Sequence, residues 1–163
     1  NAAKASEEKV RAFGLYQMLI NTCGADFGKS FTIEKLRYGR VVLLMDPDAD
    51  GIHCGVLMLL FFHRFMRPLL EAGRLAIVQA PLASISGPTF AEPLHPHTDA
   101  ELRGVFAKLA ANNINDAQTT RYRGLAGIDQ PTLAHTCVHP ATRRIRVLTL
   151  ADAQDALVVF GGN

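Results

Sequence analysis

The sequence predicts an α/β protein with a parallel-sheet core flanked by helices, and further helices at both ends of the chain. Two short apolar runs, residues 40–45 and 74–79, are rich in aliphatic residues and lack polar alternation. Such runs are typical of strands buried on both faces of a parallel sheet. The apolar segment 52–72 separates them and stops before Gly73, which favours a helix terminus. Strand, helix and strand form a βαβ unit, whose crossover is expected to be right-handed.

Caps and periodicity predict the remaining elements. A helix is expected over residues 1–20, because Ser6 can cap it and two glutamates follow. Its buried stripe is expected to contain five apolar residues: Val10, Phe13, Leu15, Met18 and Leu19. The later elements are a helical turn over 32–37, a strand over 82–85, a helix over 99–111, an extended segment over 118–125, a helix over 130–137, a strand over 143–150 and a helix over 151–160.

Composition restricts the class of protein. The 163 residues are 48% hydrophobic and carry 17 Lys+Arg against 15 Asp+Glu, which predicts one folded domain without a strong overall charge. That balance does not by itself indicate nucleic-acid binding. Cys23, Cys54 and Cys137 are too widely spaced for a zinc motif or a disulfide framework. The longest apolar run, residues 56–62, is too short to cross a membrane, so we expect a cytoplasmic protein.

Three carboxylates alternate directly after the first predicted strand, at Asp46, Asp48 and Asp50. Their mutual repulsion is unfavourable unless a positive charge lies among them. Ligands usually bind at this edge of an open α/β sheet, and hard divalent cations prefer oxygen ligands. The pattern therefore predicts a Mg²⁺ site that Mn²⁺ or Ca²⁺ could also occupy.

The spacing of these aspartates is also similar to that of three other kinds of loop. A solvated acidic turn stays open, because Asp-Pro and Asp-Gly are common in turns. An EF-hand calcium loop is excluded, because it needs an acidic residue at its twelfth position, where Leu57 stands, and a preceding helix. The nucleophilic loop of haloacid-dehalogenase phosphatases is similar, but it usually has Thr or Val in place of Asp50.

The run from Leu36 to His53 (LRYGRVVLLMDPDADGIH) resembles the TOPRIM segment of type IIA DNA topoisomerase B subunits, those of DNA gyrase and topoisomerase IV. The family typically shows K-L-R-Y, an apolar strand and then D-A-D-V-D-G-x-H. The resemblance continues in order through residues 57–73, through QAPL at 79–82 and through RYRGL at 121–125. It covers about residues 1–160.

This resemblance implies a single TOPRIM-region fragment with a Rossmann-like core. Residues 1–35 would form a helical lead-in, residues 36–128 the TOPRIM core and residues 129–163 a strand–helix segment. The family's E-G-D-S-A block, which carries an acid–base glutamate, precedes the region matched by Asn1, which is not a methionine. We therefore expect a piece of a longer protein with no complete catalytic set.

The resemblance also implies the chemistry. Enzymes of this family are ATP-dependent; they cut both DNA strands, pass another duplex through and reseal the break. A tyrosine of the partner A subunit attacks DNA in an A2B2 heterotetramer. Asp46 and Asp48 would hold Mg²⁺ directly, Asp50 would bind through water or orient its neighbours, and ATP would bind only in an upstream domain. The alternative is a free-standing TOPRIM nuclease or a primase-like phosphotransfer domain.

Four more residues are candidates for contact with DNA or a partner subunit. Arg121, Tyr122 and Arg123 combine charge and an aromatic ring, which suits phosphate contact and stacking. Composition alone equally allows an exposed strand with charged ends, and the resemblance favours the functional interpretation. His53 either lies near the phosphate or packs against the metal loop from the start of its helix, and we favour packing.

Overall fold

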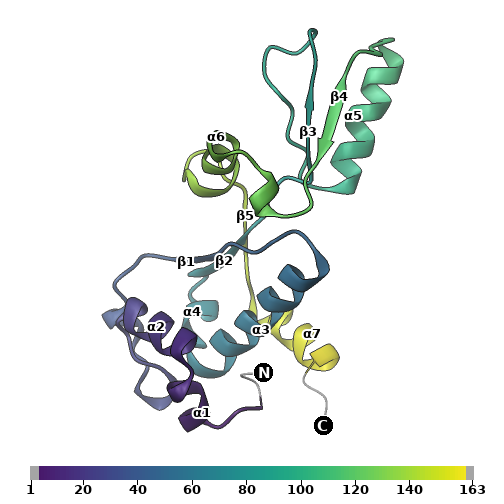
Figure 1. The fold of residues 1–163 in the computed structure, drawn as a ribbon. Coiled ribbons are helices and arrows are strands. Elements are labelled where there is room, and N and C mark those ends of the chain that lie inside the picture. The colour runs from purple at the N-terminus through teal and green to yellow at the C-terminus, as the bar shows by residue number, and fades with distance from the viewer. Residues whose placement is uncertain (1–3, 161–163) are drawn as a thin grey trace. The chain divides into compact units, whose positions relative to one another are not determined.

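The structure is a computed structural model that describes residues 4–160 (Figure 1). The chain forms two compact units. Unit 1 contains the chain up to Leu43, His53–Ile77 and the chain from Ile145 onward. Unit 2 contains Leu44–Ile52 and Val78–Arg144. Both units combine segments that are distant in sequence, so the division at residues 36 and 129 stays a prediction.

The sheet of unit 1 has the strand order β1-β2-β5. Its strands are β1 (Val41–Leu43), β2 (Leu75–Val78) and β5 (Ile145–Val147). β1 and β2 are parallel, as predicted, with Val42 opposite Ala76. On the other side of β2, Leu148 N–H donates to the Leu75 carbonyl at 2.9 Å, and Gln79 N–H donates to the Arg144 carbonyl at 2.9 Å. Residue numbers rise on one strand as they fall on the other, so β5 is antiparallel.

The α/β class is confirmed, although the sheet is mixed rather than wholly parallel. A long helix, α3 (Ala49–Phe65), connects β1 to β2, followed by the short α4 (Pro68–Glu71). The expected helix over 52–72 is thus divided, because Pro68 has no N–H to continue α3 and instead begins α4. α3 carries a run of buried side chains, which explains its unbroken apolar sequence: Leu59, Leu60, Phe61 and Phe62.

Two helices replace the single one expected near the N-terminus, of which residues 1–3 lie outside the described part. α1 (Glu7–Ala12) is capped by the Ser6 hydroxyl, as predicted, and α2 (Gly14–Cys23) follows after an extended Phe13. Because this break interrupts the helical period, the predicted buried stripe is confirmed only at Val10, which is 2% exposed, whereas Phe13 is 53% and Met18 is 59% exposed. Short 3₁₀ turns follow at η1 (Gly28–Ser30) and η2 (Ile33–Lys35), the latter within the expected 32–37.

Unit 2 contains an antiparallel pair of strands packed against a helix (Figure 1). The strands are β3 (Ala83–Ser86) and β4 (Gln118–Arg121), and the helix is α5 (Asp99–Ala111). A core of Ala83, Ile85, Leu102 and Leu109 joins them. The predicted bounds of α5 are confirmed, because Thr98 caps it by accepting a hydrogen bond from Glu101 N–H.

The remaining elements are short apart from the last helix. The predicted helix over 130–137 consists of α6 (Gln130–Leu133) and a π-helical turn, η4 (Ala134–Val138). A 3₁₀ turn, η3 (Leu125–Gly127), precedes them, and α7 (Leu150–Phe160) ends the described chain. Within residues 4–160, no helix combines the length and apolar character that a membrane span requires.

Candidate metal centre

The three predicted metal ligands lie at a junction between a strand and a helix, as expected. β1 ends at Leu43 and α3 begins at Ala49. Asp46 and Asp48 lie in the connection and Asp50 lies in the first turn of α3, and all three residues are exposed. Their side chains are therefore accessible to a solvent cation.

Asp48 also has a structural role at the start of α3. Its Oδ1 accepts a hydrogen bond from Gly51 N–H at 2.7 Å, and its carbonyl accepts one from Ile52 N–H at 2.9 Å. A carboxylate in this position satisfies an N–H group that has no partner within the helix. One oxygen of Asp48 is therefore already in use, and the direction of its carboxylate is set by the helix.

Gly51 allows the acidic turn, residues 46–50, to lie directly against the start of α3. A Cβ atom at this position would lie 2.1 Å from the carbonyl oxygen of Asp46 and 2.8 Å from its backbone nitrogen. These neighbours are backbone atoms, which cannot move aside as the end of a side chain can. Glycine is therefore required here by close approach.

Asp46 is held by a segment far away in the sequence. Its Oδ1 accepts a hydrogen bond of 2.7 Å from the backbone N–H of Leu125, 79 residues later. Gly124, just before it, leaves little room, because a Cβ there would stand 3.0 Å from the same oxygen. The acidic turn and the RYRGL segment thus meet within unit 2.

The electrostatics of the turn fit a cation. Within residues 4–160, none of the three aspartates makes an ion pair. In the same range, the second carboxylate oxygen of Asp46 and of Asp48 accepts no hydrogen bond. Two backbone donors orient these carboxylates, and each keeps one oxygen available for a ligand.

Asp46, Asp48 and Asp50 do not by themselves form a cluster of three direct ligands. Among the described residues, no three His, Cys, Asp or Glu side chains lie close enough to share a metal ion. Mg²⁺ nevertheless usually keeps several waters and is bound by one or two carboxylates together with a substrate phosphate. The available oxygens of Asp46 and Asp48 are of the kind that such an ion binds, and their role as its ligands stays a prediction.

The basic segment divides into residues with different surroundings. Arg121 pairs with Asp99 at 3.1 Å, and both side chains are 63% exposed. Tyr122 is half-buried, and its N–H donates to the Leu82 carbonyl at 2.9 Å. Arg123 is exposed, and no hydrogen bond or ion pair to any described residue holds its guanidinium. Of the two arginines, Arg123 is the better placed to receive an external phosphate.

His53 lies in α3 with its ring exposed. The ring contacts that of Phe160 in α7, with 5.6 Å between the ring centroids. The sequence did not predict this contact, which belongs to unit 1. A role for His53 towards DNA or a partner subunit stays a prediction.

Sequence reasoning missed the residues that position the aspartates. Gly51, Gly124 and the Leu125 N–H place Asp46 and Asp48, although none was a candidate. The glycines in the Asp-Gly and Arg-Gly pairs were a signal, since glycine often marks a close approach of two backbones.

The chain is similar to bacterial and archaeal proteins over nearly its whole length. It is 35% identical over 163 residues to the B subunit of DNA gyrase from Enterococcus faecalis, an alignment that covers 98% of this chain and 25% of that protein. It is 34% identical over 160 residues to the corresponding gyrase protein of Archaeoglobus fulgidus, and 35% identical over 160 residues to that of Thermotoga maritima. Both alignments cover 98% of this chain and 24% of the relative.

No protein-family model matches the chain. Several relatives nevertheless align with 98% of these residues. The chain spans about a quarter of their length. The chain is therefore a homologue of one segment of the DNA gyrase B protein, the resemblance first indicated by its LRYGRVVLLMDPDADGIH run.

Proposed function

We propose that this chain is the Mg²⁺-binding TOPRIM part of a type II DNA topoisomerase B subunit. In this role it supports double-strand DNA cleavage and religation by a tyrosine of the A subunit. The observation that carries the proposal is the 2.7 Å hydrogen bond from Leu125 N–H to Asp46 Oδ1. It joins the acidic turn to the basic RYRGL segment, residues 121–125. The groups that would bind a cation and those that would bind a DNA phosphate would therefore lie side by side.

The aspartates would act as ligands, and the backbone would orient them. Asp46 would offer the oxygen not used by Leu125, and Asp48 the oxygen not used by Gly51. Asp50 would act through water or by orienting its neighbours. When bound, Mg²⁺ supplies charge stabilisation at the scissile phosphate and the leaving oxygen. Without a cation, carboxylates and phosphate repel each other.

The basic RYRGL segment would contact the DNA backbone. Arg123 is exposed and lies one residue before Gly124, which borders Asp46. Arginine binds phosphate through several N–H donors, which suits positioning rather than sequence readout. Arg121 would have a smaller part in DNA binding, because Asp99 already accepts from its guanidinium. Tyr122 and His53 would face DNA or the A subunit.

The longer protein would supply the rest of the reaction. Its partners would be DNA and an A subunit in an A2B2 heterotetramer in the cytoplasm. An upstream domain would bind ATP, and an upstream glutamate would complete the catalytic set. The segment itself would consist of a lead-in over 1–35, a TOPRIM core over 36–128 and a strand–helix segment over 129–163.

Metal binding can be tested on this chain directly. Paramagnetic Mn²⁺, a substitute for Mg²⁺, broadens the amide NMR signals of residues near it. We expect selective broadening of the amide signals of Asp46, residues 48–51 and residues 124–125. Asp46→Asn keeps an acceptor for Leu125 N–H but removes the charge, so it should weaken the broadening. Asp155→Asn removes one exposed carboxylate from α7 and serves as the matched control. Equal broadening in both variants would contradict the assignment.

Cleavage can be tested in the longer B protein, with its upstream glutamate block, mixed with its A subunit. We expect Mg²⁺-dependent cleavage of supercoiled DNA, lost in Asp46→Ala and Asp48→Asn. The second variant uses asparagine because it keeps the cap of α3. Undiminished cleavage in both variants would rule out the proposed ligands. If the 163-residue chain cuts DNA by itself, the free-standing nuclease explains the site better.

A further inference from the structure

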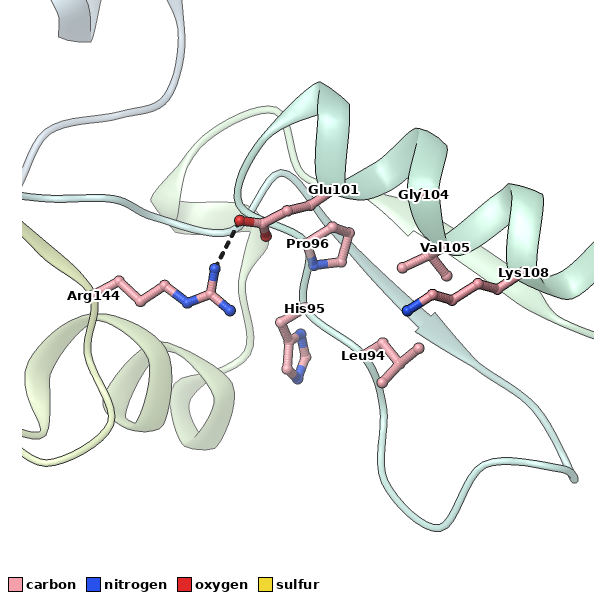
Figure 2. A pocket seen from close by; sticks show the side chains of 8 residues that line it. All are labelled: Leu94, His95, Pro96, Glu101, Gly104, Val105, Lys108 and Arg144. Carbon is pink, nitrogen blue, oxygen red and sulfur yellow. Dashed lines mark hydrogen bonds and ion pairs between the residues drawn. The ribbon is translucent and has the colours of Figure 1, made fainter.

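Unit 2 contains a cavity that is lined by none of the residues 46–51. The cavity has a volume of about 350 Å³. Figure 2 shows it between α5 and the segment 94–96, with Arg144 at one side. Its lining residues are Leu94, His95, Pro96, Glu101, Gly104, Val105, Lys108 and Arg144.

The charged groups of the cavity leave one cation unmatched. Arg144 donates to Glu101 Oε1 at 2.8 Å, and His97 N–H donates to Glu101 Oε2 at 2.9 Å. Both oxygens of the only carboxylate in the lining are therefore engaged. Lys108 faces the same space from α5 (Figure 2), and no described residue forms an ion pair with it. The cavity thus favours an anionic group near Lys108.

The imidazole ring of His95 also lines the cavity. Its Nδ1 is buried and has no hydrogen-bond partner among the described residues. Burial lowers the pKa of this histidine, nearby His97 lowers it further, and Asp129 opposes them. The ring is therefore neutral near pH 7. Since solvent does not reach Nδ1, the ring borders the cavity as an uncharged surface, and the anion is left to Lys108.

The walls of the cavity suit an organic body rather than a bare ion. Leu94, Pro96 and Val105 supply apolar surface. Gly104 leaves open space, because no atom lies within 4 Å of where its Cβ would be. The volume is at the lower end of the range of small-molecule sites, roughly 300–1,000 Å³, whose walls are usually mostly apolar.

We propose that this cavity binds a small amphipathic organic anion. Its aromatic or aliphatic body would lie against Leu94, Pro96 and Val105, and its single phosphate or carboxylate would pair with Lys108. The uncharged ring of His95 would lie beside the ligand without competing for its anionic group. This site is separate from the proposed metal centre, so either can be tested without the other.

The probe for this site is phenyl phosphate, titrated into the 163-residue chain and followed by amide NMR. Inorganic phosphate supplies the anion alone, and benzyl alcohol supplies the ring alone. We expect saturable shifts at residues 94–95 and 104–108, with phenyl phosphate binding at least about tenfold more tightly than either control. Benzoate tests whether a carboxylate replaces the phosphate. Shifts spread over the whole chain, or binding no tighter than that of inorganic phosphate, would overturn the proposal.

Matched variants on α5 identify the cavity as the site. Lys108→Ala should weaken phenyl phosphate binding at least about threefold, whereas Arg103→Ala, which removes an exposed cation outside the lining, should leave it unchanged. Gly104→Leu should fill the open space and abolish binding. Leucine also favours the helix more than glycine, so this variant should fold. Unchanged affinity in both Lys108→Ala and Gly104→Leu would refute the site.

Discussion

Gly51→Ala is a small substitution that should have a large effect on this protein. The added Cβ would lie 2.1 Å from the Asp46 carbonyl oxygen, closer than carbon and oxygen approach without a bond. Gly104→Ala makes the same change in another helix, where nothing lies within 4 Å of the new atom. Both glycines belong to unit 2, so both variants report on the same part of the fold.

The structure predicts opposite signs for the two variants. Alanine is favoured over glycine inside a helix by about 1 kcal/mol. Gly104→Ala should therefore raise the free energy of unfolding by about 0.5–1 kcal/mol. At Gly51 that gain is opposed by overpacking against backbone atoms, at the upper end of roughly 1–3 kcal/mol. The net effect of Gly51→Ala is a loss of about 2 kcal/mol.

The assay is urea and thermal unfolding of the chain, followed by circular dichroism. In a protein of this size, about 1 kcal/mol corresponds to roughly 2–4 °C in Tm. Gly51→Ala should lower Tm by about 4–8 °C, and Gly104→Ala should raise it by about 1–4 °C. If Gly51→Ala were neutral or stabilising, the acidic turn would not lie against α3 as described. The same variant should weaken Mn²⁺ binding, because the shift displaces Asp46.

Four further outcomes are expected. Asp48→Ala should lower the unfolding free energy by about 1 kcal/mol in urea titration, whereas Asp48→Asn should keep most of it, because only asparagine preserves the cap. Gly124→Ala should reduce Mn²⁺-induced broadening without unfolding the chain, because its Cβ would crowd the Asp46 carboxylate at 3.0 Å. Burial lowers the pKa of His97, so the folded state keeps its ring neutral. The free energy of unfolding should therefore decline as the pH falls below about 6.5, and it should decline less in His97→Gln. Burial opposes the ionisation of Asp152, but hydrogen bonds from Thr149 and Arg146 lower its pKa overall. The stability that this ionised carboxylate contributes above about pH 4 should be lost as the pH falls further, and the loss should be smaller in Asp152→Asn.

The local sequence determined the bounds of those helices and strands whose caps and apolar patterns lie within a few residues. α5 begins and ends where predicted, because Thr98 caps it and a polar turn follows. β1 and β2 lie inside the two aliphatic runs, because strands buried in a sheet need no polar face. The aspartates lie at the expected junction, because Asp-Pro-Asp cannot continue a buried strand and an aspartate favours the start of a helix.

Tertiary structure alone decided which distant groups meet. The contact between Asp46 and Leu125 joins residues 79 positions apart, and no local pattern encodes such a hydrogen bond. The antiparallel direction of β5 depends on the path of the chain after unit 2, which periodicity does not report. The sequence shows that three carboxylates belong to one turn, but whether they point at the same ion depends on backbone directions that packing sets. Asp48 turns one of its oxygens to the start of its own helix. The residue types alone indicate that oxygen ligands for a cation are present. Which of these oxygens are available to a cation depends on three-dimensional contacts.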